Sequence, residues 1–155
     1  MPARTFQPPS ALPAPGARAS VFLAGSIDMG AAVDWQAALT ARLADLDVDI
    51  LNPRRDEWDA SWVQRITNPD FRGQVEWELD GLDAATVIAM YLAADSKAPI
   101  SLLELGLYAH SGRLVVCCAE GFYRRGNVEV VCARFGVPLV ATPVALEAAV
   151  RARLA

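Results

Sequence analysis

The chain has 155 residues, of which 54% are hydrophobic and 21% charged, and its formal net charge is −4 at pH 7. This profile is typical of one globular domain and excludes a disordered chain, while the acidic balance argues against binding to the phosphate backbone of polymeric nucleic acid. The three cysteines lack the spacing of a disulfide framework or a zinc site, and no apolar run is long enough for a membrane helix or a signal peptide, so we expect a cytoplasmic protein with reduced thiols and no membrane association.

Residues 1–18 hold five of the ten prolines in the sequence. Proline has no backbone N–H to donate and disrupts helices and central strands, so this segment is expected to be irregular. We therefore divide the chain into a Pro-rich irregular leader, residues 1–18, and one folded domain, residues 19–155.

Five short apolar segments within residues 19–155 predict strands, at 21–24, 48–51, 86–92, 114–118 and 137–141. Apolar residues at helical spacing predict helices between and after them, at 34–46, 71–82, 100–110, 126–135 and 144–154. In the helix at 71–82, the apolar face is expected to contain Val75, Leu79 and Leu82.

Strands that alternate with helices form right-handed βαβ units and a parallel sheet. We predict an α/β fold of the flavodoxin-like or Rossmann-like class, a three-layer sandwich whose five-stranded parallel sheet has the order 2-1-3-4-5. Ligands of such folds bind beyond the carboxyl ends of the strands, at the point where the strand order reverses. The loops to search for a site are therefore 25–30, 93–99 and 119–126.

The first of these loops contains Gly25, Ser26 and Asp28 and ends at Gly30. Glycine lets the backbone approach a ligand closely, and the helix that follows favours negative groups at its start. The segment matches neither a phosphate-binding P-loop nor a dinucleotide-binding fingerprint. It is either a ligand loop or a plain strand-to-helix turn.

Glu104 is a single carboxylate in an apolar helix start, beside the predicted reversal of strand order. A carboxylate among apolar groups is costly unless it has a partner or a function. The alternative is a solvated face, because Ser101, Glu104 and Tyr108 fall on one side of the helix.

The preceding helix carries several further acids. Glu76 and Asp80 fit a solvated acidic face, whereas Glu78 and Asp83 are candidates for a second carboxylate near Glu104. Two neighbouring carboxylates would allow one to attack a substrate while the other transfers a proton.

Polar residues also follow two other predicted strands. Asn52 and the pair Arg54-Arg55 follow the second strand, and Arg124-Arg125 lies beside Asn127 after the fourth. These arginines either contact a phosphate or polar substrate edge, or form surface ion pairs. Two tryptophans of the long loop after the second strand either stack on a base or cap the core, namely Trp58 and Trp62.

Four segments, in this order, resemble the nucleoside 2-deoxyribosyltransferase family. Val21–Ser26 resembles the family's first strand and glycine loop, and Leu79–Ile88 resembles its acidic helix leading to the third strand. Leu103–Ala109 resembles its nucleophile motif, and Gly126–Glu129 resembles a segment that completes a neighbouring subunit's site. The resemblance covers about residues 20 to 140.

The resemblance implies roles for individual residues. Glu104 matches the nucleophilic glutamate, and Glu78 lies where the family usually has an aspartate that contacts or protonates the base. Asn127 matches an asparagine that reaches the sugar of the adjacent subunit, and Asp95 is the one match to the acids that precede the nucleophile. Asp28 stands where related nucleotide hydrolases have a phosphate-binding arginine, which favours nucleosides over nucleotides.

These roles imply an enzyme that cleaves the N-glycosidic bond of (deoxy)nucleosides through a glycosyl-glutamate and transfers the sugar to another base or to water. Glu104, Glu78 and Asp83 are the expected catalytic residues; the expected substrate-binding residues are Gly25, Ser26, Asp28, Asn52, Arg55, Asp95 and Asn127. No metal or organic cofactor is expected, and a homodimer or higher homo-oligomer would share its active sites. The alternatives are a non-catalytic nucleoside- or nucleotide-binding module, a (deoxy)nucleoside 5′-monophosphate N-glycosidase, and an unrelated flavodoxin-like regulatory domain.

Overall fold

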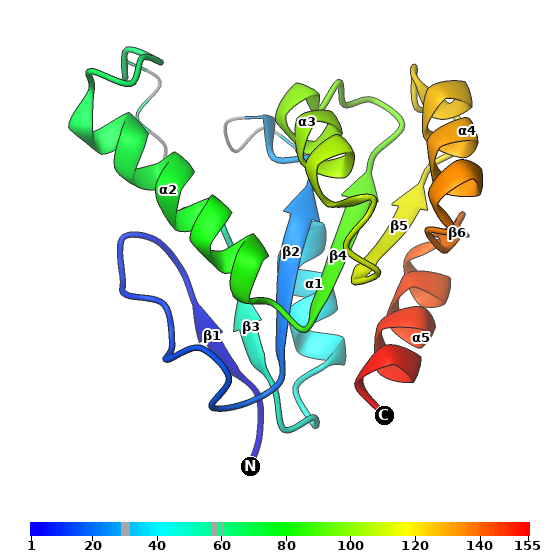
Figure 1. The fold of residues 1–155 in the computed structure, drawn as a ribbon, viewed down its shortest axis with the longest axis horizontal. Coiled ribbons are helices and arrows are strands. Elements are labelled where there is room, and N and C mark those ends of the chain that lie inside the picture. Colours follow the sequence, from blue (N-terminus) through cyan, green and yellow to red (C-terminus); the bar gives the residue numbers. More distant parts are fainter. Residues whose placement is uncertain (29–31, 57–58, 60) are drawn as a thin grey trace.

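A parallel sheet of six strands forms the centre of the computed structural model, which describes residues 1–28, 32–56, 59 and 61–155. The carboxyl ends of the strands lie at one edge of the molecule (Figure 1). The strands are β1 (Arg4–Phe6), β2 (Ser20–Gly25), β3 (Asp49–Leu51), β4 (Val87–Leu92), β5 (Leu114–Cys118) and β6 (Leu139–Val140). The helices are α1 (Trp35–Arg42), α2 (Pro69–Ala84), α3 (Pro99–Tyr108), α4 (Arg125–Phe135) and α5 (Pro143–Leu154).

The strand order is β1-β3-β2-β4-β5-β6, and every neighbouring pair is parallel. The last five strands along the chain therefore have the predicted order 2-1-3-4-5, and the three-layer α/β class is confirmed. The prediction of five strands was wrong by one, because Arg4–Phe6 in the expected irregular leader pairs with β3. Three residues bounded by prolines carry no strand signal of their own; β1 forms because the free edge of β3 supplies hydrogen-bonding partners.

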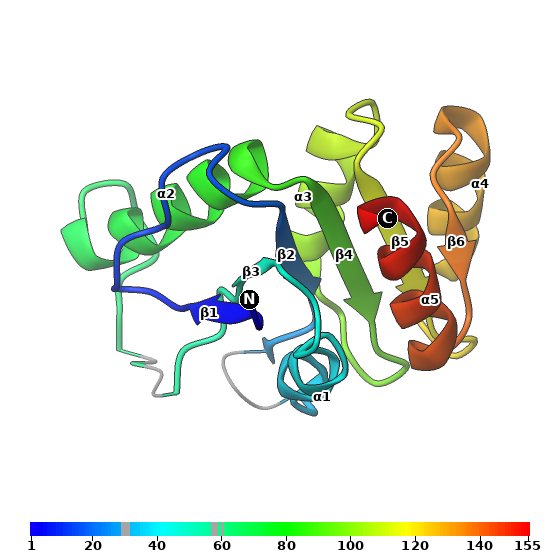
Figure 2. The ribbon, with the colours of Figure 1, turned by 90° about the horizontal axis from the view of Figure 1, so that it is seen from below.

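Helices cover both faces of the sheet (Figure 2). One apolar cluster joins Phe22 and Met90 of the sheet to Trp77 of α2, Leu105 of α3 and Val128 of α4. A second cluster on the opposite face joins the sheet to α1 and α5 through residues that include Leu39 and Val150. The central strands are covered on both sides, so they contain nearly continuous apolar runs. Within the described ranges, no helix is long and apolar enough to cross a membrane.

The buried face of α2 differs from the predicted one. Its buried residues are Gln74, Trp77, Gly81 and Leu82, whereas Val75 and Leu79 are each 37% exposed. A Cβ atom on Gly81 would lie 2.8 Å from the Phe22 ring, so this glycine lets α2 approach β2. Periodicity predicted Leu82 correctly but not the rest of the buried face, because a glutamine and a glycine occupy two of the buried positions.

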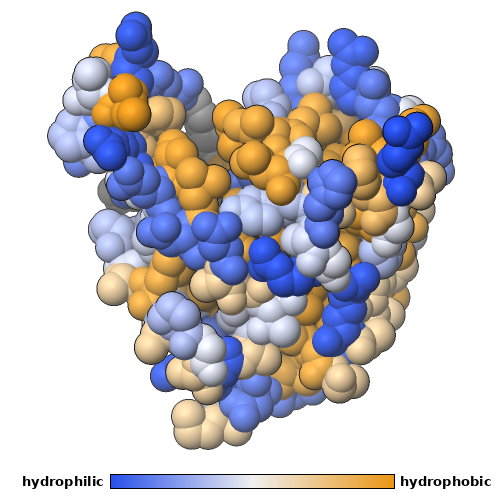
Figure 3. All heavy atoms as spheres, in the orientation of Figure 1, coloured by the Kyte–Doolittle hydropathy of each residue, from blue (hydrophilic) through white to orange (hydrophobic). Residues whose placement is uncertain are grey.

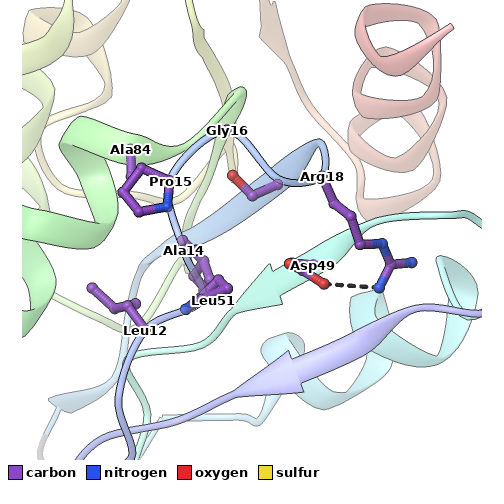
Figure 4. Close-up of a pocket in the computed structure, with 10 residues that line it drawn as sticks. Leu12, Ala14, Pro15, Gly16, Arg18, Asp49, Leu51 and Ala84 are labelled. Carbon is purple, nitrogen blue, oxygen red and sulfur yellow. Dashed lines mark hydrogen bonds and ion pairs between the residues drawn. The ribbon is translucent and has the colours of Figure 1, made fainter.

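The leader runs beneath α2 and contributes to the core. Leu12 packs against the apolar cluster under α2, and Trp77 Nε1 donates a 2.9 Å hydrogen bond to the Ser10 carbonyl. Figure 4 shows a small pocket between the leader and the sheet, with Arg18 reaching the Asp49 carboxylate at 2.9 Å. Arg4 donates to the same carboxylate at 2.9 and 3.0 Å, so two arginines tie the leader to the start of β3.

Candidate active site

Glu104 is a buried carboxylate that accepts no hydrogen bond from the described residues. It lies in the second turn of α3, which begins at Pro99, and it is 7% exposed. Its carboxylate forms no hydrogen bond or ion pair with any residue in the part of the chain that the structure describes. Burial, with a smaller contribution from repulsion by Glu78, raises the pKa of the Glu104 carboxyl to about 8. A site that tolerates this cost is a candidate for function.

Glu78 of α2 is the second carboxylate of the site, and it is half-buried. Gln74 Nε2, one helical turn earlier, donates a 2.8 Å hydrogen bond to Glu78 Oε2. Burial raises the pKa of Glu78 to about 7, although the Gln74 hydrogen bond and the charge of Arg55 act in the opposite direction. Negative charge on Glu78 disfavours negative charge on Glu104.

Arg55, in the loop after β3, reaches this pair through Gln74. Its Nε donates a 2.6 Å hydrogen bond to Gln74 Oε1, and its guanidinium lies 4.8 Å from the centre of the Trp62 ring. Gln74 also donates to the Pro53 carbonyl at 3.2 Å. The sequence analysis missed Gln74, although its position four residues before Glu78 on a helix was a signal for side-chain pairing.

Arg54 holds the same loop from the other side. Its guanidinium donates to the carbonyls of Ala32 and Val33 at 2.6 and 3.1 Å and to Gln36 Oε1 of α1 at 3.2 Å. Asn52 Oδ1 accepts a 3.0 Å hydrogen bond from the Arg54 N–H, so the buried Asn52 side chain shapes the turn. The loop that carries Arg55 is therefore fixed between α1 and α2.

Gly25 and Ser26 form a tightly packed strand end. A Cβ atom on Gly25, whose φ is +133°, would overlap the Tyr91 carbonyl oxygen and lie 2.7 Å from the Tyr91 nitrogen. Ser26 is fully buried: its Oγ accepts from Ala93 N–H at 3.1 Å, and its carbonyl accepts from Trp35 Nε1 at 3.0 Å. These residues join β2, β4 and α1 at the carboxyl edge of the sheet.

Asp28 and Asp95 are exposed at the same edge of the sheet. Asp28 adopts a left-handed backbone conformation with φ of +50°, and its Oδ1 accepts a 3.1 Å hydrogen bond from Ser96 Oγ. The loops after β2 and β4 are thus joined by a side-chain contact. Other residues of the sequence-predicted loops, Met29, Gly30 and Trp58, lie outside the described residues.

Asp83 contacts Tyr108 near the opposite end of α2. The Tyr108 hydroxyl donates a 2.7 Å hydrogen bond to Asp83 Oδ1, one turn of α3 beyond Glu104. Burial, the Asp83 hydrogen bond and nearby carboxylates raise the pKa of Tyr108 to about 12. The structure therefore groups Glu78 with Glu104, and Asp83 with Tyr108.

Asn127 is exposed in the first turn of α4. Its side chain forms no hydrogen bond within the described part of the chain, whereas the neighbouring Arg125 donates to the Cys118 carbonyl and lies 3.5 Å from Glu129. Among the described residues, no group of three or more histidines, cysteines and acids could hold a metal ion.

A family model described as nucleoside 2-deoxyribosyltransferase like matches residues 18–122 of the chain. The protein belongs to the nucleoside 2-deoxyribosyltransferase-like family. Glu78 and Glu104 lie inside the match, whereas residues 1–17 and Asn127 lie outside it.

The fold of this nucleoside 2-deoxyribosyltransferase-like protein is similar to that of a solved structure from Enterococcus faecalis V583, described as a conserved protein. The TM-score is 0.63 at 14% identity, and the alignment covers 89% of this chain and 100% of that chain. This likeness concerns the fold alone. A search of the curated proteins gives no significant match.

Proposed function

We propose that the protein cleaves the N-glycosidic bond of (deoxy)nucleosides through a covalent intermediate on Glu104. The observation that carries this proposal is the Glu104 carboxylate, which is 7% exposed, accepts no hydrogen bond from the residues that the structure describes and is repelled by a second carboxylate, Glu78. Two such acids are what a retaining reaction at an anomeric carbon requires. Family membership supports the same chemistry.

In the first half-reaction, a Glu104 carboxylate oxygen forms a bond to the anomeric carbon as the bond from that carbon to the base nitrogen breaks. The electron pair of the broken bond stays on the base. Glu78, in its protonated form, donates its proton to that base, which leaves neutral. Glu104 becomes a glycosyl ester and Glu78 a carboxylate.

In the second half-reaction, an incoming base or a water molecule attacks the anomeric carbon. Glu78 accepts the proton that the acceptor releases, and the ester bond to Glu104 breaks. With a base as acceptor the protein is a transferase, and with water it is a hydrolase. Only side-chain carboxylates take part in these steps.

The substrate-binding residues of this proposal come from the loops that follow β2, β3 and β4. Gly25, Ser26 and Asn52 shape the strand ends beneath the substrate, and Arg55 faces it from the loop after β3. Asp28 and Asp95 place negative charge at the rim, which would repel a 5′-phosphate and favours nucleosides.

Arg54 and Arg55 give little support to the alternative, a 5′-monophosphate N-glycosidase. Among the described residues, the Arg54 guanidinium donates to Ala32, Val33 and Gln36, and Arg55 contacts Gln74 and Trp62. A phosphate would have to compete with these contacts. Nucleosides are therefore the first substrates to test.

A second copy of the chain completes the site in this proposal. The outer face of α3 carries Ile100, Leu103 and Leu107, which are 60%, 61% and 55% exposed on either side of Glu104. Figure 3 shows apolar side chains gathered over α3 and on the face of α2 turned toward it. Burial of this face in a homodimer or higher oligomer would bring the partner's exposed α4 start, with its asparagine, to the sugar. A cytoplasmic location stays a prediction from the sequence.

The test is base release or base exchange with a panel of deoxynucleosides and deoxynucleotides, with and without a second base. We expect activity with nucleosides, loss of at least about 10³-fold in Glu104→Gln, and no comparable loss in Glu76→Gln, whose exposed side chain pairs with Arg72 on the same helix as Glu78. A 2-fluoro sugar substrate should leave a mass adduct on Glu104. A folded wild-type protein that binds nucleosides without turnover would contradict the catalytic proposal and support a binding module.

A further inference from the structure

The two carboxylates of the site have unequal surroundings. Glu78 receives a 2.8 Å hydrogen bond from Gln74 and faces the charge of Arg55. Glu104 receives no hydrogen bond from any described residue. A donor favours the charged form of the carboxylate that accepts from it. The arrangement therefore favours negative charge on Glu78 over negative charge on Glu104.

The Gln74 amide is held in one orientation by its three partners. Its oxygen accepts from Arg55 Nε at 2.6 Å, and its nitrogen donates to the Pro53 carbonyl at 3.2 Å and to Glu78. The reverse orientation would place the amide oxygen against a carbonyl and a carboxylate, and the amide nitrogen against a guanidinium. Gln74 is 5% exposed, so water cannot readily replace these partners.

We propose that Gln74 is a positioning residue that keeps Glu78 charged and fixed in the empty site, so that the one proton of the acidic pair rests on Glu104. The catalytic consequence of this arrangement rests on the proposed function. In that reaction, a proton would keep the nucleophile Glu104 neutral until a substrate binds. The proton would pass from the Glu104 carboxyl to Glu78 and from Glu78 to the departing base. The Glu104 oxygen that loses the proton forms the bond to the sugar, so atoms and charges balance.

Charged and titratable groups around Glu78 come from three elements. Arg55 lies on the loop after β3, Glu104 on α3, and Gln74 is the polar neighbour on α2 itself. Tyr108 on α3 is the other titratable group near Glu104, and its hydroxyl proton is directed to Asp83. Gln74 is thus the uncharged donor that links Arg55 of the loop after β3 to the Glu78 carboxylate.

Gln36 on α1 provides a matched control. It is fully buried like Gln74, and its oxygen also accepts from an arginine of the same loop, Arg54, at 3.2 Å. Its nitrogen donates to the Ser26 carbonyl at 3.3 Å and not to a carboxylate. Removal of either side-chain amide breaks buried hydrogen bonds. Only the Gln74 variant also removes a hydrogen-bond donor to Glu78.

The first measurement is a carbon-13 NMR titration of the glutamate side chains in the ligand-free wild-type protein, with Glu78→Gln and Glu104→Gln used for assignment. We expect Glu78 to lose its proton at lower pH than Glu104. The opposite order would overturn the proposal. This measurement needs no activity, so it separates the proposal from the function on which its meaning rests.

The second measurement is the same titration in Gln74→Met and Gln36→Met. We expect the midpoint of the Glu78 titration to rise by about one pH unit in Gln74→Met and to stay within about 0.3 pH unit of the wild-type value in Gln36→Met. Equal shifts in both variants, or none in either, would show that Gln74 has a structural role only. If Gln74→Met does not fold, Arg55→Lys, which keeps the positive charge but removes the Nε donor that holds the Gln74 amide, must shift the Glu78 titration in the same direction for the proposal to stand.

Discussion

The Tyr108 hydroxyl lies 2.7 Å from Asp83 Oδ1 and joins the last turn of α3 to the last turn of α2. The helix residue one turn earlier than Tyr108 is Glu104. The contact therefore links the two helices that carry Glu78 and Glu104, and it gives Asp83 a partner other than these two glutamates.

Neutral substitutions of Asp83 and Glu78 should have very different effects on activity. We expect Glu78→Gln to lower kcat/KM by at least about 10²-fold, because it removes the group that transfers the proton in the proposed reaction. Asp83→Asn should lower it less than about 10-fold, because an amide oxygen still accepts from Tyr108. Steady-state rates of base release at neutral pH decide between them. A loss in Asp83→Asn as large as that in Glu78→Gln would assign the acid to Asp83.

Glu104→Gln should stabilise the protein at high pH. The pKa of the Glu104 carboxyl is raised by burial to about 8, above its value of about 4.3 in an unfolded chain, so the folded state binds the proton more tightly. The free energy of unfolding therefore falls as the pH rises from about 4.5, and this loss is complete above about pH 8. We expect Glu104→Gln to melt about 5 °C higher than the wild type at pH 9 and at the same temperature at pH 4.5.

The control for this pH effect is Glu76→Gln, an exposed change on α2. Its melting temperature should follow that of the wild type within about 1 °C at both pH values. If Glu104→Gln raises the melting temperature by the same amount at pH 4.5 as at pH 9, the charge of the Glu104 carboxylate is not the cause of the increase.

Gly25→Ala should unfold the protein in less urea than any comparable glycine change. The added methyl group would overlap the Tyr91 carbonyl in the sheet, so a strand pair must shift, at a cost on the order of 3 kcal/mol or more. Gly112→Ala, at a φ of +74° with open space around it, should cost only about 1 kcal/mol. Urea midpoints of the two variants measure the difference, and equal midpoints would contradict the steric argument.

Arg18→Met should destabilise the protein more than Arg4→Met. Both arginines donate to the Asp49 carboxylate, whose side chain is 2% exposed, but the Arg18 side chain is 13% exposed and that of Arg4 48%. Water can replace Arg4 more readily, so we expect losses of about 2–3 kcal/mol for Arg18→Met and about 1 kcal/mol for Arg4→Met. Urea unfolding at pH 7 gives both values, and the reverse ranking would contradict this account.

The five main strands, their order and the edge that carries the site were predictable from the sequence. Segments such as Val21–Ala24 are apolar throughout because helices cover both faces of the sheet. Glu104 stood out because it is a lone acid in an apolar helix start. The family match at residues 18–122 confirms the resemblance on which its role was based.

Other features depend on tertiary contacts that periodicity does not encode. The buried face of α2 contains Gln74, whose polar groups are satisfied by Arg55, Pro53 and Glu78. β1 forms only because β3 offers a free edge. The sequence left two alternatives for Arg54 and Arg55, contact with a phosphate or polar substrate edge or surface ion pairs. The structure shows a third use, because both arginines donate to backbone carbonyls or glutamine side chains that hold the loop after β3.

The leader also has a consequence for solubility. β1 covers the edge of β3, and it is itself a poor template for further pairing, because it is three residues long, begins at Arg4 and is soon followed by Pro8 and Pro9. A fragment cut at residue 18, where the family match begins, would uncover the polar backbone of β3 and the apolar ring of Trp77 together. Such a fragment would expose an unpaired strand edge to other molecules, so aggregation during its expression would result from the cut and not from the intrinsic behaviour of the full fold.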